Sequence, residues 1–328
     1  MKRICIIGTG SMARNCPGKL GDGLILGAFA SYLYDQGLEV CLLTNPMAYP
    51  YLKSSLNYQI RKVEDDTDLW EAFRPFYEWA DAVVIPKPLE NPDVSKFKRR
   101  LQHQHHPASP SLLHIGGLDA FSTSRHILWQ LFDEAVPSLG IPMPQKVYPM
   151  VFFPLEEKAP LDAQSSHVHT LVLPVAGGRL KQLTPGQVCG LRDAMGSPAE
   201  IVATEYGSDP TQLKTLEDNL QGLISAGFYV SSVPQLFVKA MCARRIIGAD
   251  SGLMWLLVSF LNGRARQGKL ERSYFPQIMV FHQGALRRVP SFQSWHPLLV
   301  YPEKLIKIDA KDFSMQCFQD GREEKAGD

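Results

Sequence analysis

The segment VPQLFVKAMCARRIIGADSGLMWLL, residues 233–257, carries the pattern that decides the fold of this chain. An apolar run of helical period, Val233 to Ala243, leads into the short β-branched stretch Arg245 to Gly248, and a second apolar helix opens at Gly252. A buried strand between two helices is typical of crossover units, which build parallel sheets. The segment therefore predicts an α/β fold.

The same alternation extends to both sides of this segment. In the first half we expect helices at Leu24–Gln36 and Leu69–Trp79, and strands at Arg3–Ile7, Glu39–Thr44 and Ala82–Ile85. The polar residues 90–112 are expected to form an exposed excursion. In the second half we expect helices after Thr184-Pro185 and Asp209-Pro210, and strands at His169–Pro174, Glu200–Glu205, Phe228–Val230 and Gln277–Phe281.

A proline-dense segment separates the two alternating halves. It runs from Gly140 to Ser166, and proline removes a backbone donor, so this segment suits a linker better than a central strand. The sequence thus predicts an N-terminal domain over residues 1–155, a C-terminal domain over residues 156–318 and a polar tail over residues 319–328. Both domains are expected to be α/β.

Composition excludes several classes of protein. The chain has 328 residues, of which 45% are hydrophobic and 20% charged, so it can bury a large core and is not disordered. Its net charge of +1 provides no overall attraction to nucleic acid. No apolar run has the length of a membrane span, no secretory signal is evident, and the 6 cysteines lack a Cys-x-x-Cys pair. We expect a cytoplasmic protein without a transmembrane segment, which leaves room for a peripheral membrane contact.

A glycine-rich motif after the first expected strand admits two interpretations. Gly8-Thr-Gly-Ser-Met-Ala13 matches the dinucleotide-binding fingerprint, which would make the protein an NAD(P)-dependent oxidoreductase. That interpretation needs a helix near Gly10, whereas Pro17 and the glycines at 18, 21 and 23 would interrupt one. We therefore favour a long loop that ends where a helix begins near Leu24, although the oxidoreductase stays as an alternative.

Three motifs together resemble one known family. Asp250-Ser-Gly-Leu-Met-Trp-Leu-Leu257 is similar to the Asp-Thr-Gly-Leu-Met-His-Leu-Ala element of the ADP-heptose:lipopolysaccharide heptosyltransferases, glycosyltransferase family nine. Gly21-Asp-Gly-Leu-Ile25 resembles the Gly-Asp-Val-Leu element of that family, and Lys181-Gln-Leu-Thr-Pro185 resembles its Lys-x-Trp-Pro segment. Arg125-His-Ile127, followed by Leu139-Gly-Ile141, is similar to the helix that closes the first domain of the family.

The resemblance implies a GT-B architecture, with two Rossmann-like domains facing each other across a cleft. It also implies an inverting, metal-independent transfer of a heptose from ADP-heptose to an acceptor hydroxyl, with no cofactor. The N-terminal domain would receive the acceptor and the C-terminal domain the nucleotide-sugar donor. The acceptor is left open among a glycan, a protein and a small metabolite, and the resemblance implies no nucleic-acid partner.

Site residues follow from the matched positions. Asp22 would be the general base, although by position alone it could instead cap the first helix. Lys181 would add positive charge near the phosphates, and Asp250 would lie near the donor sugar or else cap its helix. The remaining donor-binding candidates are Ser251, Gly252, Leu253 and Trp255, and the candidates for contact with acceptor or phosphate are Lys19, Gly21 and Gly23.

Departures from the family pattern motivate a further alternative. Trp255 stands where the family has histidine, and Leu183 where it has tryptophan, so the chain could bind nucleotide sugars without catalysing transfer. Histidines at 103, 105 and 106, and at 167 and 169, could bind a metal, but their surroundings favour no metal site. The basic run Lys96 to Arg100 is read as a solvated helix face, with an acceptor-side contact as the alternative.

Overall fold

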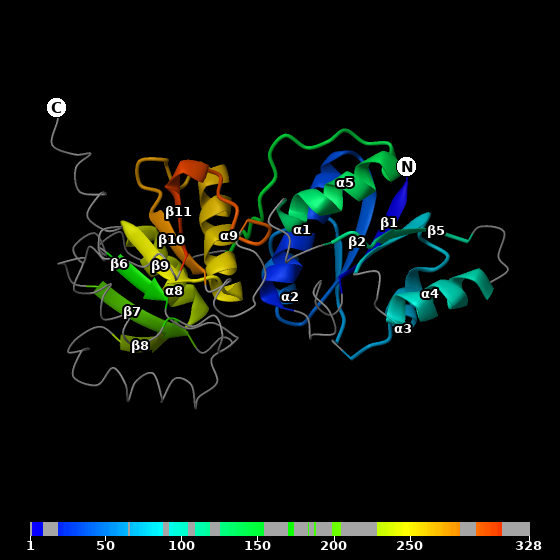
Figure 1. The fold of residues 1–328 in the computed structure, drawn as a ribbon, viewed down its shortest axis with the longest axis horizontal. Coiled ribbons are helices and arrows are strands. Elements are labelled where there is room, and N and C mark those ends of the chain that lie inside the picture. The colour runs from blue at the N-terminus through cyan, green and yellow to red at the C-terminus, as the bar shows by residue number, and fades with distance from the viewer. Residues whose placement is uncertain are drawn as a thin grey trace. The chain divides into compact units, whose positions relative to one another are not determined.

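The computed structural model of the chain describes residues 2–8, 19–64, 66–87, 92–103, 109–118, 125–153, 170–173, 183, 187, 199–204, 228–282 and 293–309. The chain divides into two units (Figure 1). The first comprises Met1–Phe153 and Pro290–His296, and the second comprises Pro154–Val289 and Pro297–Asp328. The short segment Pro290–His296, which the sequence analysis assigned to the second domain, therefore packs with the first unit.

The first unit is built on a parallel sheet of five strands. The strands are β1 (Arg3–Gly8), β2 (Glu39–Thr44), β3 (Gln59–Lys62), β4 (Ala82–Pro86) and β5 (Ser111–Ile115). Their order across the sheet is β3-β2-β1-β4-β5, and each neighbouring pair is parallel. Four of the six residues of β1 are apolar and fully buried, as expected for a central strand covered on both faces.

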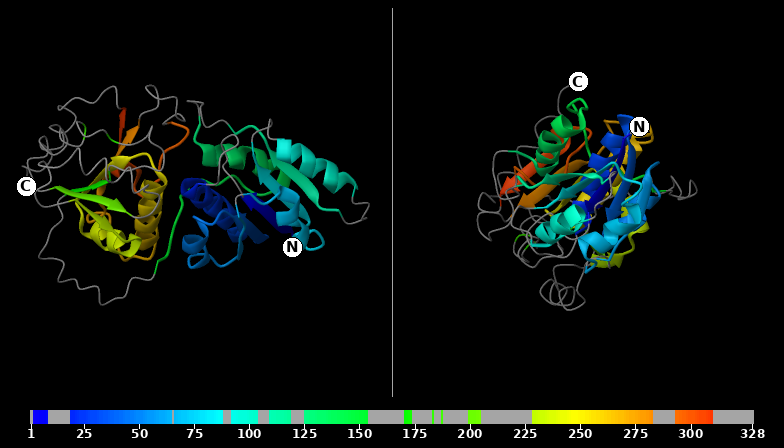
Figure 2. Two further views of the ribbon diagram at one scale, coloured as in Figure 1. Left: turned by 90° about the horizontal axis from the view of Figure 1, so that it is seen from below. Right: turned by 90° about the vertical axis from the view of Figure 1, so that its right-hand side faces the viewer.

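Helices cover both faces of this sheet (Figures 1 and 2). On one face, α1 (Leu20–Asp35) packs against α5 (Ile127–Leu139), with the Phe29 and Phe132 rings 5.2 Å apart, and α2 (Tyr49–Lys53) lies beside α1. On the other face, α3 (Leu69–Phe73), the 3-10 turn η1 (Arg74–Phe76) and α4 (Pro92–His103) form a second layer. The unit is therefore a three-layer Rossmann-like domain.

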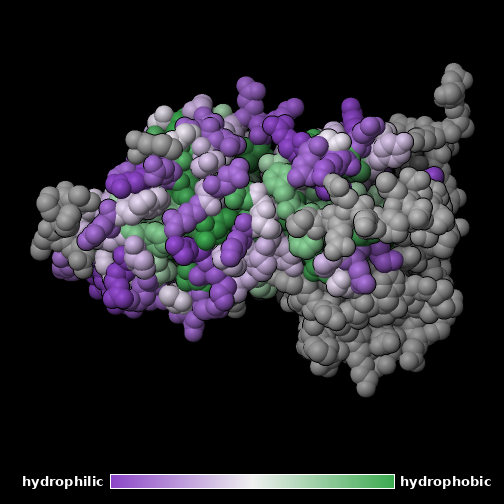
Figure 3. Space-filling view, turned by 180° about the vertical axis from the view of Figure 1, so that it is seen from behind, coloured by the Kyte–Doolittle hydropathy of each residue, from purple (hydrophilic) through white to green (hydrophobic). Residues whose placement is uncertain are grey.

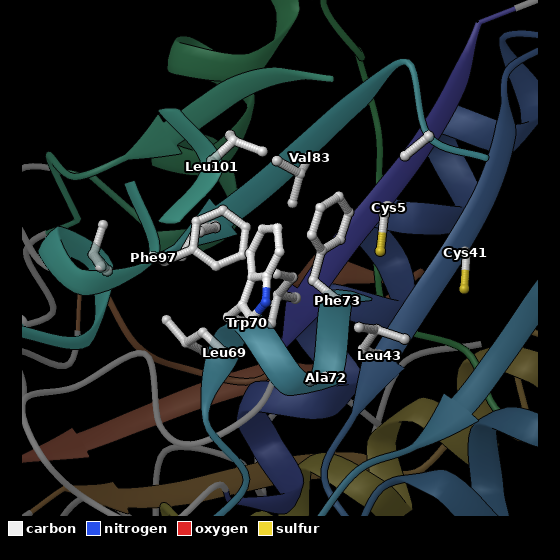
Figure 4. Packing of buried hydrophobic residues seen from close by; sticks show 14 residues of the cluster. Cys5, Cys41, Leu43, Leu69, Trp70, Ala72, Phe73, Val83, Phe97 and Leu101 are labelled. Atoms are coloured by element: carbon white, nitrogen blue, oxygen red, sulfur yellow. The ribbon is translucent and has the colours of Figure 1, made fainter. Parts of the chain in front are cut away.

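An aromatic cluster fills the second layer. Trp70 and Phe73 of α3 meet Phe97 of α4 at ring distances of 5.8 and 5.5 Å, and Cys5 of β1 and Cys41 of β2 lie to one side of these rings in the same cluster (Figure 4). The expected excursion over residues 90–112 is wrong, because this region contains α4 and β5. Polar residues dominate α4, and its helical signal is confined to three buried positions, Val94, Phe97 and Leu101.

The second unit repeats the architecture with six strands. These are β6 (Thr170–Leu173), β7 (Ala199–Thr204), β8 (Phe228–Ser231), β9 (Arg245–Ala249), β10 (Gln277–His282) and β11 (Leu305–Asp309). Their order is β11-β10-β9-β6-β7-β8, and all neighbouring pairs are parallel. Numbered within the unit, this is the strand order of a dinucleotide-binding Rossmann sheet. The described helices are α8 (Val233–Cys242) and α9 (Gly252–Arg266), with a 3-10 turn, η4 (Pro302–Lys304), before β11.

Most expected elements are confirmed within a few residues, and the misses are informative. The expected helix at Leu24–Gln36 begins four positions earlier, at Leu20, and α3 ends at Phe73, well before Trp79. The short elements α2, β3 and β11 had no distinct signal. The helices expected after Pro185 and Pro210 lie outside the described residues, as do residues 154–166 of the expected linker.

The segment that returns to the first unit binds the start of α5. The Ile127 amide donates to the Ser294 carbonyl over 2.8 Å, and His126 Nε2–H donates to the His296 carbonyl over 2.9 Å. The same imidazole accepts from the Leu128 amide through Nδ1, so His126 is the N-cap of α5. Both ring nitrogens are thus used in structural bonds within this unit.

Hydrophilic side chains cover much of the described surface on the face seen in Figure 3, with smaller apolar areas between them. Large hydrophobic side chains that are exposed are few among the described residues, namely Tyr34, Met143 and Tyr274. No helix within the described ranges has both the length and the apolar character needed to span a bilayer.

Candidate active site

Each sheet has a topological switch point, where neighbouring crossovers leave in opposite directions. Ligands of open parallel sheets bind outside the carboxyl ends of the strands at this position. In the first unit it lies between β1 and β4, and in the second between β6 and β9. Helix α1 follows β1, and Asp250 and Ser251 follow β9 directly, so both groups of candidate residues lie at switch points.

Asp22 lies in the first turn of α1. It is the third residue of the helix, and its side chain is only 2% exposed. The cap interpretation of Asp22 is wrong, because the N-cap position is occupied by Lys19, whose side chain makes no capping bond. The Gly23 amide donates to the Lys19 carbonyl over 3.2 Å, which closes this turn. A buried carboxylate beside a helix N-terminus is stabilised by the local dipole.

Glycine has low helical propensity, and the packing around position 23 explains why α1 nevertheless contains one there. A Cβ at this position would collide with the Cβ of Ala48, the residue that precedes α2. One turn later, a Cβ on Gly27 would lie 2.7 Å from a Leu52 methyl group. Close packing of α1 against the β2–α2 region therefore outweighs the helix-breaking tendency of glycine, which the sequence analysis had weighted more strongly.

Asn45 joins this packed region to the N-terminus of α1, and the sequence analysis did not single it out. Its Nδ2 donates to the Lys19 carbonyl over 3.2 Å, and its Oδ1 accepts from the Ala48 amide over 3.0 Å. The side chain is fully buried just after β2. In the sequence, Asn45 is indicated only by its position, because it is a polar residue that directly follows a predicted buried strand.

The other candidates of the first unit, Gly21 and Lys19, lie at the start of α1. Gly21 is buried within α1, and Lys19 is exposed. Residues 9–18, which contain most of the glycine-rich motif, are not described, and α1 begins at Leu20. In the second unit, Lys181 is outside the described residues, whereas Leu183 is buried.

At the start of α9, capping belongs to Ser251. The Ser251 hydroxyl accepts from the Met254 amide over 3.3 Å, and the Ser251 carbonyl accepts from the Trp255 amide over 3.1 Å. The interpretation of Asp250 as the cap is therefore wrong. The amides of Gly252 and Leu253 precede the first intrahelical bond, so they have no partner within the helix. Such amides at a helix N-terminus are suited to phosphate oxygens.

Asp250 is buried, with 2% of its surface exposed. Its backbone amide donates to the Phe281 carbonyl of β10 over 3.0 Å, and Oδ1 accepts a long hydrogen bond, 3.4 Å, from the Trp255 indole. Trp255 itself is 1% exposed. The strand below is equally tight, because a Cβ on Gly248 would lie 2.8 Å from both the Leu173 carbonyl and the Met254 terminal methyl.

The basic run on α4 is engaged within its own unit. Asp68 accepts from Lys96 over 2.6 Å and from Arg100 over 3.1 Å, and Lys98 lies 3.2 Å from His114. Partial burial opposes ionisation of Asp68, but the Lys96 hydrogen bond and its neighbours outweigh this, and the pKa of Asp68 is lowered. These bonds favour a structural role for the two residues that pair with Asp68.

Within the described part of the chain, no three His, Cys, Asp or Glu side chains are grouped as a metal site would require. The histidines at 105, 106, 167 and 169 lie outside the described residues, and His103 is at the end of α4. The free cysteines include Cys5 and Cys41, which are register partners in neighbouring strands. Burial raises the pKa of the Cys5 thiol, which is consistent with an unreactive core position.

These features define a class of fold. The chain consists of two Rossmann-like units with parallel sheets, which is the fold of the GT-B glycosyltransferases. No protein-family model matches the sequence, and no curated protein matches it either.

Solved structures of glycosyltransferases share this fold over nearly the whole chain. Heptosyltransferase WaaC of E. coli, solved with ADP, matches 97% of this chain and 98% of its own, with a TM-score of 0.59 and 11% identity. A family 9 glycosyltransferase of Veillonella parvula matches 98% of this chain and 88% of its own, with a TM-score of 0.61 and 15% identity. The E. coli ADP-heptose heptosyltransferase II matches 94% and 90%, with a TM-score of 0.56 and 13% identity.

Proposed function

We propose that this protein is an inverting glycosyltransferase that moves a heptose from ADP-heptose to an acceptor hydroxyl without a metal ion. The observation that carries the proposal is the position of Asp22 and of Asp250-Ser251-Gly252 at the switch points of the two Rossmann-like units. The similar folds of WaaC with ADP and of heptosyltransferase II support the choice of donor. The proposed acceptor domain is the first unit, and the proposed donor domain is the second.

On the donor side, the leaving group is a nucleoside diphosphate that gains negative charge as the glycosidic bond lengthens. The amides of Gly252 and Leu253 in the first turn of α9 would donate to its oxygens. The absence of a side chain on Gly252 lets a phosphate approach the backbone closely. Lys181 would add a charge whose stabilisation grows toward the transition state.

On the acceptor side, the attacking hydroxyl must lose its proton as the new bond forms. The Asp22 carboxylate would accept that proton as the general base, a contribution of about 10² to 10⁴ in rate. The contacts of Gly23 with Ala48 and of Asn45 with Lys19 support this role, because they fix the helical turn that carries Asp22. Lys19 is exposed at the same helix end and could contact an acceptor or a phosphate.

Thermal unfolding in the presence of ADP, GDP and UDP tests the donor class. A ligand at about 100 times its Kd adds about 2.7 kcal/mol of stability, so ADP should raise Tm by several degrees, and more than GDP or UDP. Turnover is then measured as ADP release from ADP-heptose with candidate acceptors. Equal shifts with all three nucleotides would count against an ADP-linked donor, and no shift with any of them would count against a nucleotide-sugar enzyme.

The replacement at position 255 favours a second candidate, a nucleotide-sugar-binding protein that does not catalyse transfer. The indole has one donor and no charge, and that donor is directed to Asp250. A charged phosphate contact from this position is therefore missing. Transfer or hydrolysis of any nucleotide sugar by the purified protein, abolished by Asp22→Asn, would exclude this candidate.

A further inference from the structure

Trp255 not only fills the core but also donates a hydrogen bond to Asp250. An indole has one hydrogen-bond donor and no acceptor, and a buried indole N–H usually requires a partner. Trp255 lies in the second turn of α9 and is 1% exposed. Its Nε1–H is directed to Oδ1 of Asp250, five residues earlier, over 3.4 Å.

Asp250 is held on its backbone as well as through its side chain. The amide donates to the Phe281 carbonyl over 3.0 Å, which fixes the main chain beside β10. Ser251 is the N-cap residue of α9, so Asp250 precedes the cap position. A buried carboxylate that is held through both its main chain and its side chain has a fixed orientation, which suits a directed contact.

Trp255 lies in a fully buried stretch of α9. The Ser259 hydroxyl donates to the Trp255 carbonyl over 2.7 Å, and Phe260 of the same helix stacks on Phe237 of α8 with ring centroids 4.1 Å apart. The residues of α9 from Leu253 to Gly263 are all buried. Side chains in such close-packed interiors rarely change rotamer, so the indole N–H offers a fixed direction to the carboxylate.

We infer that Trp255 is a positioning residue, which orients the Asp250 carboxylate toward the sugar of the donor. This inference rests on the proposed function, because it takes the start of α9 as the donor site. Since the single donor of the indole is used on Asp250, Trp255 does not bind phosphate, and the diphosphate is left to the main-chain amides of Gly252 and Leu253. A contact of Asp250 with the sugar then depends on Trp255, whereas binding of ADP does not.

The first experiment tests the contact itself, by NMR of the tryptophan indoles in the full-length protein. The chain has 5 tryptophans, and the Trp255 indole resonance is assigned as the one missing in Trp255→Phe. Asp250→Asn should move this resonance upfield and leave the other indoles in place, because a carboxylate is the stronger acceptor. An unchanged Trp255 resonance in a folded Asp250→Asn protein would overturn the inference.

The second experiment separates the sugar from the nucleotide by calorimetric titration with ADP and with ADP-heptose. Trp255→Phe should weaken ADP-heptose binding about tenfold or more, as expected for loss of a bond to a carboxylate, and leave ADP binding within twofold. In an Asp250→Ala background, which has no side-chain acceptor for the indole, the same change should have no further effect. Trp70→Phe, in the aromatic cluster of the first unit, is the matched control and should alter neither affinity.

The outcomes distinguish the two proposals. If the unaltered protein binds neither ligand, the proposed function fails, whatever the NMR result for the indole. If it binds both and Trp255→Phe weakens them equally, or if its effect persists undiminished in the Asp250→Ala background, Trp255 is a structural residue and the positioning role fails.

Discussion

The helices that begin at the two switch points, α1 and α9, have their N-termini held by different kinds of contact. In the second unit, the chain passes from β9 to α9 within Asp250 and Ser251, and the helix is capped by the Ser251 side chain. In the first unit, the residues between β1 and α1 run from 9 to 19, and the N-cap Lys19 makes no side-chain bond. The N-terminus of α1 is held instead by tertiary contacts of Gly23 and Asn45. The start of α9 is thus fixed by a residue of its own connection, whereas the start of α1 is held by contacts with the β2–α2 region.

The largest effect on turnover should come from replacing Asp22, which lies in the first turn of α1. Asp22→Asn keeps the shape of the side chain but removes the base, so kcat should fall about 10² to 10⁴-fold while ADP affinity is retained. Steady-state kinetics and calorimetric titration measure the two effects. Normal turnover in this variant would remove Asp22 as the base.

Gly23→Ala should show that neighbouring elements hold α1. The new Cβ meets the Cβ of Ala48, which cannot rotate away, so the variant should lose about 1–3 kcal/mol of unfolding free energy and much of its turnover. Gly27→Ala is the matched control, because its new Cβ meets the end of the Leu52 side chain, whose χ angles can change, and not a Cβ fixed to the backbone. Denaturant unfolding and kinetics compare the two, and equal losses would contradict the assigned role of the Gly23 contact.

Ser251→Ala tests the N-terminus of α9, which is capped by its own connection. Loss of the cap to the Met254 amide should cost about 1 kcal/mol of stability and weaken ADP binding modestly. Ser251→Thr restores a hydroxyl and should recover most of both. Thermal unfolding and titration with ADP provide the measurements. A stability loss in Ser251→Ala that Thr does not recover would point to packing, not capping.

The smallest effect is expected at the opposite, amino edge of the first sheet. Arg3 bonds Asp81 there over 3.0 Å, and the hydrogen bond from the Arg3 side chain lowers the pKa of Asp81. A lowered folded pKa contributes stability above the unfolded value of about 3.9, and this is lost as pH falls through the folded value. Asp81→Asn should therefore be slightly less stable than the unaltered protein at pH 7, and denaturant unfolding at falling pH should show this difference vanish once the folded Asp81 is protonated. Turnover should be unchanged, because Asp81 lies at the edge of the sheet opposite the candidate site. A change in turnover would contradict this expectation.

Much of the architecture could be predicted from local pattern. Buried strands such as β1, β2 and β9 are continuous apolar runs, and α8 has both a capping box at Ser232 and a helical period. The pattern failed where the apolar signal was sparse. Helix α4 buries only three positions, and β3 and β11 are short edge strands whose residues are largely exposed or half-buried.

The candidate site was predicted as a set of residues but not as a geometry. Ser251 and Asp250 could be located because they interrupt apolar runs between a strand and a helix. Which of them caps α9 depends on backbone angles that the pattern does not fix, and the structure assigns the cap to Ser251. Asn45 was missed because its two bonds join residues 19 and 48, a relation that only the folded chain creates.

The sequence by itself determined the α/β class and the parallel sheets, because period and burial are encoded in neighbouring residues. Only the tertiary structure decided where α1 begins, since glycine is unfavourable in an isolated helix and becomes required at position 23 once Ala48 packs against it. It also brought the Trp255 indole within hydrogen-bond distance of the Asp250 carboxylate. Local propensities are small, and contacts between distant elements outweigh them wherever the packing is close.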